Sequence, residues 1–448
     1  MFKIFQIVIV KSMDMGAHES YESYVSVSVN KKMRIEFTVV IMLCTVFISP
    51  CLADNIAAEP NIGYNSPVSD NRQFLSQEGH PYLGINMRGY YTSMAQSRDS
   101  KFLFPNNYYE SSFQILSKTP AIDHVRYRFY WESYIKNPTA FMNEIEQVAN
   151  TADKYGIKVI YDNHQFHTSS WLNVDRGTGF PHYLFNDSLL YKQNSGGSPK
   201  SVAAKAWWTN WWNDAVRVNG TDGCVLQLDF LKKIVKTAEK HPSTLGYEIL
   251  SEPQVHDADQ WSKIGKYNNF IINELRNLTN KTIIYSMNIP IDLKSPIGVN
   301  ASNLAKMSPI NKENVVFKFS MYGIPSEGYQ RDKLQLFENT SRIAGVPLYI
   351  GEWNNVKRVE TYNQRGEKVW YIDPSLSDIS QAIANRIVNN FRNIGVWGLA
   401  FWEWSFIPSN TPNFNLVNNS YNNNTSQGLL HPTKYYTIMK NAYEQLNN

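Results

Sequence analysis

The sequence predicts an α/β fold, a single (β/α)8 TIM barrel. Short apolar segments with the character of buried strands recur along the chain, and a helical segment or a long loop follows each of them. Eight such units occur. Alternation at this number is typical of a closed parallel barrel, whose site is built at the carboxyl ends of the strands. The predicted strands are Tyr82–Met87, His124–Trp131, Lys158–Asp162, Leu245–Ile249, Thr282–Ser286, Asn314–Phe319, Val346–Glu352 and Val396–Trp402.

The helices are predicted from apolar residues that recur at helical spacing. Pro138–Tyr155 has this pattern, and Gly156 is its natural C-terminal stop. The other predicted helices are Tyr109–Leu116, Phe230–Lys240, Trp261–Leu278, Leu334–Ile343, Ile379–Ile394 and Tyr435–Leu446.

Two segments are longer than a minimal barrel needs. Gln165–Gly223 follows the third strand, and the Asn-rich segment Ser409–Gln427 follows the eighth. Both leave from the rim where a site would be built, so both could wall a cleft. The first contains Trp207-Trp208 and Trp211-Trp212 at helical spacing. We expect these rings to pack the core of the insertion, the alternative being that they line distal sugar subsites.

The first 53 residues are interpreted as an upstream extension followed by a secretory signal peptide. Lys31–Arg34 is basic, Phe37–Ser49 is apolar but too short to span a bilayer, and Cys51–Ala53 resembles a cleavage site. Because this signal begins at Met33, we expect translation to start there. Residues 54–80 are a polar tail and residues 81–446 the barrel. The protein is therefore expected to be secreted and extracellular, with no membrane association after cleavage.

The overall composition excludes several classes of function. The chain has 43 Lys and Arg against 39 Asp and Glu, a net charge of +4 and no long basic run, so nucleic acid is not an expected partner. It has no G-x-S-x-G, P-loop or zinc-type cysteine cluster, and no metal or other cofactor is expected. Only Cys224 lies outside the leader, so no internal disulfide can form. We expect a monomer.

Two glutamates stand at the ends of predicted strands. The apolar run Leu245–Ile249 leads to Glu252-Pro253, and proline is excluded from the middle of a sheet, so Glu252 is placed at the strand tip. A second apolar run ends in Glu352. Paired carboxylates can hydrolyse a glycoside, one protonating the leaving oxygen and the other supplying electron density at the anomeric carbon. A separation of about 5–5.5 Å gives retention and about 6.5–9.5 Å gives inversion. We predict the short separation.

The chain resembles glycoside hydrolase family 5, the cellulase and mannanase group, across roughly residues 81–446. Six matches to family motifs fall at strand ends and in the family's order, which makes the set specific although each match alone is weak. Val125–Glu132 is similar to VRxPxxWE, Tyr161–His164 to D-x-H, Tyr247–Pro253 to E-L-x-N-E-P, Phe319–Tyr322 to F-H-x-Y, Ile350–Glu352 to I-G-E and Ala400–Trp404 to the strand-eight tryptophan segment.

The resemblance implies a role for each matching residue. Glu252 corresponds to the acid/base, expected to be neutral in apolar surroundings, and Glu352 to the nucleophile, expected to be ionised beside Arg126 and Tyr322. The implied substrate-binding residues are Arg126, His164, Ser251, Ser320, Tyr322 and Trp402. Arg126 and Arg128 have the same strand parity, and we favour Arg126. Trp402 is the expected sugar platform, with core packing as the alternative. Glu248 is interpreted as a buried polar residue of the barrel.

Two positions depart from the family pattern. Ser251 stands where the family has asparagine, and Ser320 where it has histidine. The family asparagine hydrogen-bonds the sugar 2-hydroxyl, so these changes affect the expected rate and substrate. The expected function is a secreted, retaining endo-β-1,4-glycosidase acting on β-glucan or cellulose-type polysaccharide. The alternatives are an endo-β-1,4-mannanase of the same fold and a catalytically weakened carbohydrate-binding barrel.

Overall fold

A computed structural model describes residues 80–93, 107–172, 178–185, 202–287, 298–362, 368–372, 377–405, 414–421 and 428–447. The predicted extension, signal peptide and nearly all of the tail lie outside these residues, as does much of the Asn-rich segment. No helix in the described ranges is long and apolar enough to cross a bilayer.

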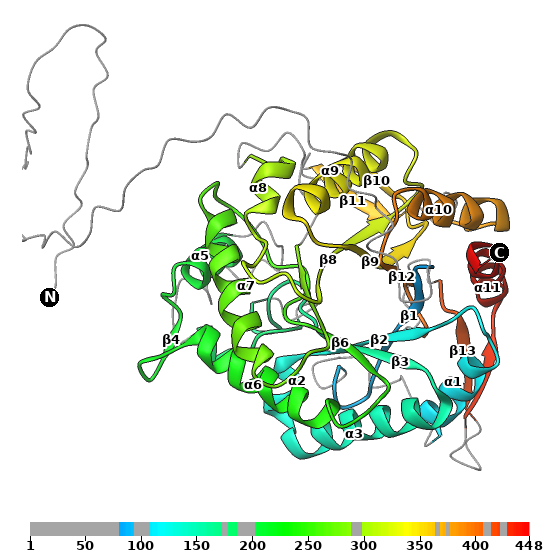
Figure 1. The fold of residues 1–448 in the computed structure, drawn as a ribbon, viewed down its shortest axis with the longest axis horizontal. Coiled ribbons are helices and arrows are strands. Elements are labelled where there is room, and N and C mark those ends of the chain that lie inside the picture. The colour runs from blue at the N-terminus through cyan, green and yellow to red at the C-terminus, as the bar shows by residue number, and fades with distance from the viewer. Residues whose placement is uncertain are drawn as a thin grey trace, which may run out of the picture. The chain divides into compact units, whose positions relative to one another are not determined.

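Eight parallel strands close into a barrel with helices around it, so the predicted TIM-barrel fold is confirmed (Figure 1). The order around the barrel is β1-β12-β9-β8-β7-β6-β3-β2. Each predicted strand overlaps an observed one. The observed barrel strands are β1 Tyr82–Arg88, β2 His124–Phe129, β3 Lys158–Asn163, β6 Thr244–Glu248, β7 Thr282–Ser286, β8 Val315–Tyr322, β9 Leu348–Asn354 and β12 Gly398–Phe401.

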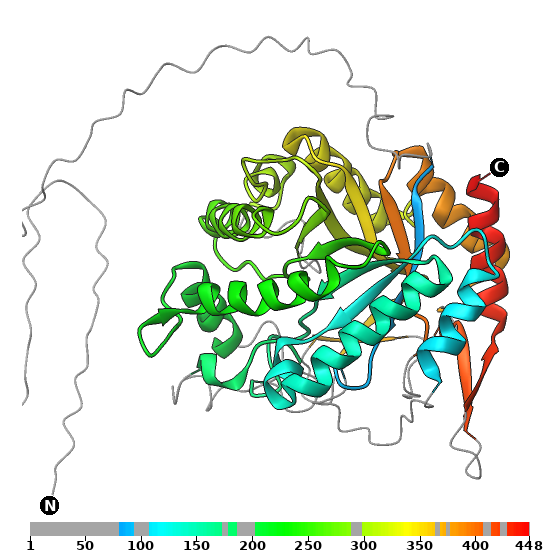
Figure 2. The same cartoon turned by 60° about the horizontal axis from the view of Figure 1, so that its bottom comes forward.

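The surrounding helices cover the outer face of the barrel (Figure 2). They are α1 Tyr108–Ser117, α2 Trp131–Lys136, α3 Pro138–Tyr155, α6 Gly223–Ala238, α7 Gln260–Arg276, α8 Ala301–Ala305, α9 Gly328–Ala344, α10 Gln381–Asn393 and α11 Lys434–Asn447. Helix α3 has the predicted bounds, because the Asn137 side chain caps its first turn and Gly156 ends it in the left-handed conformation, at φ 69°.

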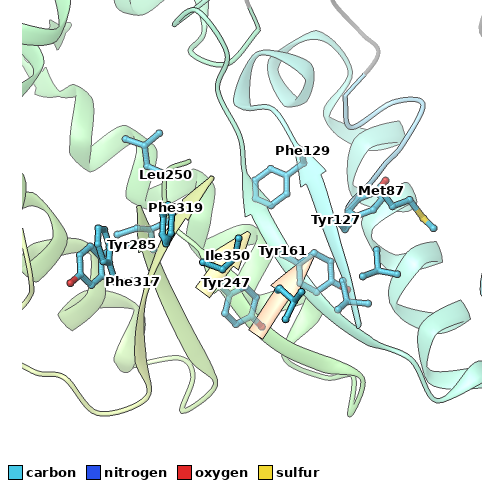
Figure 3. Packing of buried hydrophobic residues seen from close by; sticks show 14 of the residues in the cluster. Met87, Tyr127, Phe129, Tyr161, Tyr247, Leu250, Tyr285, Phe317, Phe319 and Ile350 are labelled. Carbon is cyan, nitrogen blue, oxygen red and sulfur yellow. The ribbon is translucent and has the colours of Figure 1, made fainter. Parts of the chain in front are cut away.

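The strands alternate between two packed faces. Aromatic and aliphatic side chains on the outer face meet the helices: Phe319 stacks on Phe337 of α9, and Phe129 packs against Phe141 of α3. Figure 3 shows Phe319 and Phe129 among the packed side chains of this core. A smaller apolar cluster packs separately, formed by Ile160, Ile284, Val316, Tyr349, Trp397 and Ala400. Ile160 and Val316 of this cluster share strand parity with Asp162 and Lys318, described below, and the cluster fills one end of the barrel interior.

The insertion after β3 has a core of its own. It contains the short helix η2 His182–Phe185, helix α5 Val202–Trp212 and a hairpin of β4 Arg217–Val218 and β5 Thr221–Asp222. All four tryptophans of α5 are buried, and Trp207 stacks on Trp211 while Trp208 stacks on Trp212. The prediction that these rings pack the insertion core is confirmed.

Two hairpins lie outside the predicted elements. β10 Arg358–Tyr362 pairs with β11 Lys368–Ile372 directly after β9, and β13 Val417–Tyr421 pairs with β14 Gly428–Pro432. The second hairpin starts within the segment predicted as an Asn-rich loop. Strand β13 contains two asparagines, Asn418 and Asn419, and asparagine is a poor strand former, so local composition did not indicate the hairpin.

Replacing Trp208 with alanine tests whether α5 depends on its buried rings. The indole is fully buried and its nitrogen donates a hydrogen bond to the Thr168 hydroxyl at 2.9 Å. We expect a loss of about 3–5 kcal/mol of unfolding free energy, because a cavity and an unpaired hydroxyl are left. Urea unfolding followed by tryptophan fluorescence measures the loss. Val202→Ala is the control, since Val202 is 64% exposed on the same helix. A loss for Trp208→Ala no larger than for Val202→Ala would contradict the assignment.

Candidate active site

Polar side chains gather at the carboxyl end of the barrel interior, beyond the smaller apolar cluster. They come from six different strands and from the loop after β6, so no short stretch of sequence contains the group. Those that are fully buried or nearly so are Asn86, Arg126, Asp162, Glu248, Ser251, Lys318 and Glu352.

Glu352 faces this group because β9 contains a bulge. On the β8 side, Phe319 pairs with Ile350 and Ser320 with Glu352, so Gly351 of β9 has no partner in the register. The pairing of β9 with β12 also shows one extra residue of β9, between Ile350 and Trp353. Ile350 and Trp353 pack among the outer apolar side chains. A β-bulge re-aims the side chain that follows it, and Glu352 is thereby turned into the barrel.

Three donors hold the Glu352 carboxylate. Arg126 Nη1 donates to Oε1 at 3.0 Å and Lys318 Nζ donates to the same oxygen at 3.1 Å, while the Tyr322 hydroxyl donates to Oε2 at 2.5 Å. Burial by itself would raise the pKa of Glu352. Lys318 and Arg126, followed by His164 and Tyr322, outweigh burial and lower that pKa well below its ordinary value. Glu352 is therefore ionised at neutral pH.

Glu252 lies in the loop beyond β6, which ends four residues earlier at Glu248. The sequence placed Glu252 at the strand tip. Its backbone instead has φ 52°, a left-handed conformation that is uncommon without glycine and that cannot continue a strand. Such conformations persist where the surroundings enforce them. Here the Glu252 amide donates to Ser286 Oγ at 2.8 Å, and the Gln165 side chain donates to the Glu252 carbonyl at 2.5 Å.

The Glu252 side chain points to the same group and is 18% exposed. Ser320 Oγ donates to its Oε1 at 2.6 Å, and Lys318 Nζ lies 3.8 Å from that oxygen. The prediction that Glu252 has apolar surroundings is wrong at Oε1, where a hydroxyl and an ammonium face it. Because Lys318 Nζ is also 3.1 Å from Glu352 Oε1, the two carboxylate oxygens are at most about 7 Å apart (3.1 Å plus 3.8 Å). This upper limit admits the retaining separation of about 5–5.5 Å and only the shortest inverting separations, from about 6.5 Å.

Arg126 is the centre of the ion pairs in this group. It contacts Glu248 at 2.7 Å, Asp162 at 2.8 Å and Glu352 at 3.0 Å, and it donates to Ser251 Oγ at 3.0 Å. The interpretation of Glu248 as a buried polar residue is confirmed. Arg128, which has the same strand parity, is buried as well, but it contacts different partners. Arg128 pairs with Glu403, and its guanidinium lies 4.0 Å from the centre of the Trp402 ring.

His164 and Trp402 lie side by side. His164 Nδ1 is 2.9 Å from Asp162 Oδ2, and its ring stacks on Trp402 with an interplanar angle of 29°. Burial lowers the pKa of His164 to about 3, so the ring is neutral and its Nδ1 donates to Asp162. Trp402 is half-buried, whereas tryptophans that only pack the barrel, such as Trp353, are fully buried.

The sequence reasoning missed Lys318. Its ammonium donates to Ser251 Oγ at 3.2 Å and to Ser320 Oγ at 3.1 Å, so it contacts both positions that depart from the family pattern. A signal was present: Lys318 is a charged residue inside the apolar run Val315–Tyr322, with the same parity as Ser320 and Tyr322. No group of three or more potential metal-ligating side chains occurs in the part of the chain that the structure describes.

The chain is similar to known proteins both in sequence and in fold. An endoglycoceramidase of Cyanea nozakii is 29% identical over 145 residues, which is 29% of this chain and 27% of that protein. The match therefore spans about a quarter of the relative.

Several solved structures share the fold. An endogalactoceramidase superimposes with a TM-score of 0.53 at 17% identity, covering 73% of this chain and 71% of that one. Endo-glycoceramidase II from Rhodococcus sp. gives 0.52 at 15% identity, covering 76% and 78%. An endo-β-1,4-glucanase from Xanthomonas axonopodis pv. citri, a triple mutant, gives 0.51 at 14% identity, covering 82% and 99%.

A family model covers most of the barrel. The model described as Cellulase (glycosyl hydrolase family 5) matches residues 75–388, a span that includes both glutamates. The chain belongs to glycosyl hydrolase family 5 and is a glycoside hydrolase.

Proposed function

We propose that the protein is a retaining, endo-acting β-glycosidase that works by double displacement. One observation carries the proposal: a buried, ionised Glu352 and a partly exposed Glu252 face the same ammonium, with their nearest contacting oxygens at most about 7 Å apart (3.1 Å plus 3.8 Å). A limit of about 7 Å admits the separation of about 5–5.5 Å that a retaining pair of carboxylates needs.

In the first step Glu352 is the nucleophile. Its carboxylate oxygen bonds to the anomeric carbon as the glycosidic bond breaks, and the electron pair of that bond goes to the leaving oxygen. Glu252 gives its proton to that oxygen. Arg126 and Tyr322 hold the attacking carboxylate in place, which lowers the cost of reaching the reactive geometry.

In the second step Glu252 acts as a base. It takes a proton from water, whose oxygen bonds to the anomeric carbon, and the electron pair of the glycosyl ester returns to Glu352. Trp402 is half-buried, with His164 stacked beside it and the Arg128 guanidinium over its ring, and its exposed part is the proposed contact for the sugar. Because His164 is neutral and its Nδ1 contacts Asp162, its other ring nitrogen is an acceptor for a sugar hydroxyl.

The substrate we favour is a β-1,4-glucan, on the basis of the motif resemblance and of the endoglucanase among the similar structures. A β-mannan remains the alternative of the same fold. We propose that the enzyme is secreted, on the basis of the predicted N-terminal signal, and that it acts as a monomer.

A second substrate class has support of its own. The curated relative is an endoglycoceramidase, and several similar structures are endo-glycoceramidases. We therefore propose a β-glycosylceramide as the second candidate, in which the same two glutamates would cleave the bond between the sugar and the lipid.

Replacing Glu352 with alanine tests the nucleophile. We expect kcat/KM to fall by about 10⁴-fold or more, because the covalent intermediate cannot form. Reducing-sugar release from the best substrate measures this. Glu274→Gln is the matched control, since Glu274 pairs with Lys232 across the outer helices and its loss should leave the rate unchanged. Wild-type rates in the Glu352→Ala enzyme would rule out its assignment.

The stereochemical outcome tests the double displacement. Two inversions at the anomeric carbon give a product that initially has the β configuration. Proton NMR of the first product, recorded before mutarotation, distinguishes it from the α anomer. An α product would mean direct attack by water and would overturn the retaining mechanism.

A substrate panel separates the two substrate classes. We expect release of oligosaccharides from one of carboxymethylcellulose, barley β-glucan, xyloglucan, mannan or detergent-dispersed lactosylceramide, measured by chromatography with Glu352→Ala in parallel. Release from a polysaccharide supports the first candidate, and release of lactose from the lipid with none from the polysaccharides supports the second. Activity that persists in Glu352→Ala would argue against the proposed site.

A further inference from the structure

Lys318 is a fully buried ammonium at the centre of the carboxyl end of the barrel. Burying a charge costs several kcal/mol unless it is paired and hydrogen-bonded. Lys318 lies on β8 with its side chain inside the barrel, and its partners come from β9 and from the loop after β6 as well as from β8.

Three contacts match the three N–H groups that an ammonium carries. Nζ donates to Glu352 Oε1 at 3.1 Å, to Ser320 Oγ at 3.1 Å and to Ser251 Oγ at 3.2 Å. One partner is a carboxylate and two are hydroxyls, and each hydroxyl keeps its own proton to donate onward.

Ser320 uses that proton on the other glutamate. Its hydroxyl donates to Glu252 Oε1 at 2.6 Å, and Lys318 Nζ itself lies 3.8 Å from the same oxygen. A single cation therefore contacts Glu352 directly and Glu252 through one serine.

The space for this side chain comes from three small residues. A Cβ at Gly351 would lie 2.5 Å from Lys318 Cε and 2.6 Å from its Cγ. Ser251 and Ser320 are shorter than the asparagine and histidine of the family pattern. The ammonium lies between the two serines, where the longer side chains would compete with it.

We propose that Lys318, Ser251 and Ser320 act as one positioning unit that holds both glutamates and keeps one positive charge beside whichever of them is ionised. The proposal rests on the proposed double displacement. In the proposed mechanism Glu352 carries the negative charge before the first step. After the first step Glu352 is a neutral glycosyl ester and Glu252 has given up its proton, so the negative charge now lies beside the same ammonium.

Several other ionisable groups face Glu352 or Lys318 and remain in place in the variants below. They are Arg126 and Arg128 from β2, Asp162 and His164 from β3 and its end, Glu248 from β6, Tyr322 from β8 and Glu403 after β12. Arg126 continues to stabilise the ionised Glu352, so removing Lys318 weakens this stabilisation without abolishing it.

Two variants separate the two arms of the unit. Lys318→Met removes the ammonium from both glutamates. Ser320→Ala keeps the ammonium on Glu352 and removes only the hydroxyl that contacts Glu252. The probes are 2,4-dinitrophenyl β-cellobioside, whose leaving group needs no proton, and phenyl β-cellobioside, whose leaving group needs general acid assistance; the matching β-lactosides serve if the wild type prefers them.

We expect Ser320→Ala to lower kcat/KM about 10²-fold on the phenyl glycoside and less than about 5-fold on the dinitrophenyl glycoside, because only acid catalysis is affected. We expect Lys318→Met to lower kcat/KM about 10²–10³-fold on both. The acid limb of the pH profile of kcat/KM for Lys318→Met should also move to higher pH, because with one cation fewer Glu352 is protonated more readily. A merely structural residue would change neither the leaving-group dependence nor the acid limb.

Lys333→Met is the matched control. Lys333 is also buried, but its ammonium donates to the main-chain carbonyl of Ser320 at 2.8 Å. We expect this variant to lose stability and to keep the wild-type acid limb and leaving-group dependence.

The outcomes distinguish the inference from the function on which it rests. A wild type that neither hydrolyses the glycosides nor is labelled at Glu352 by a 2-deoxy-2-fluoroglycoside overturns the proposed function and the inference with it. A wild type that turns over, with a wild-type acid limb for Lys318→Met and equal losses on both leaving groups for Ser320→Ala, overturns the inference alone. If Lys318→Met does not fold, the leaving-group comparison for Ser320→Ala decides by itself.

Discussion

The carboxyl end of this barrel depends on a balance of buried charge. Arg126 and Lys318 are both excluded from solvent, and each is paired with Glu352, while Arg126 also pairs with Glu248 and Asp162. An unpaired charge at such depth would cost several kcal/mol, so these side chains stabilise one another's positions. The Glu352 carboxylate is therefore ionised and oriented before any substrate binds. Transition-state stabilisation requires such preorganisation.

The bulge in β9 makes this balance possible. In a regular strand, residue 352 would lie on the same face as Ile350, toward the helices. The extra residue lets Ile350 and Trp353 stay in the outer core while Glu352 turns inward. The same irregularity brings Gly351 against Lys318, where no larger side chain fits. One local departure from strand geometry thus orients a carboxylate and makes room for its cation.

The insertion after β3 supports the second glutamate. Gln165, at its start, donates to the carbonyl of Glu252, and Trp212, at the end of α5, donates to the carbonyl of Gln254 at 2.8 Å. The packed tryptophans therefore stabilise the loop in which Glu252 adopts its left-handed backbone. A segment that is additional to the minimal barrel is in this way tied to the geometry of the pair of glutamates.

Strand periodicity along the chain predicted the barrel, its eight strands and the placing of Glu252 and Glu352 at one rim, and the motif resemblance added Arg126 and Tyr322. Apolar periodicity and the rule that parallel strands end together are local properties that can be read along a chain. Only the tertiary structure decided that Lys318 lies between the glutamates, that Glu352 faces inward and that Glu252 stands beyond its strand. The physical reason is that pairing register and the meeting of side chains from separate strands depend on neighbours distant in sequence, and no local pattern encodes them.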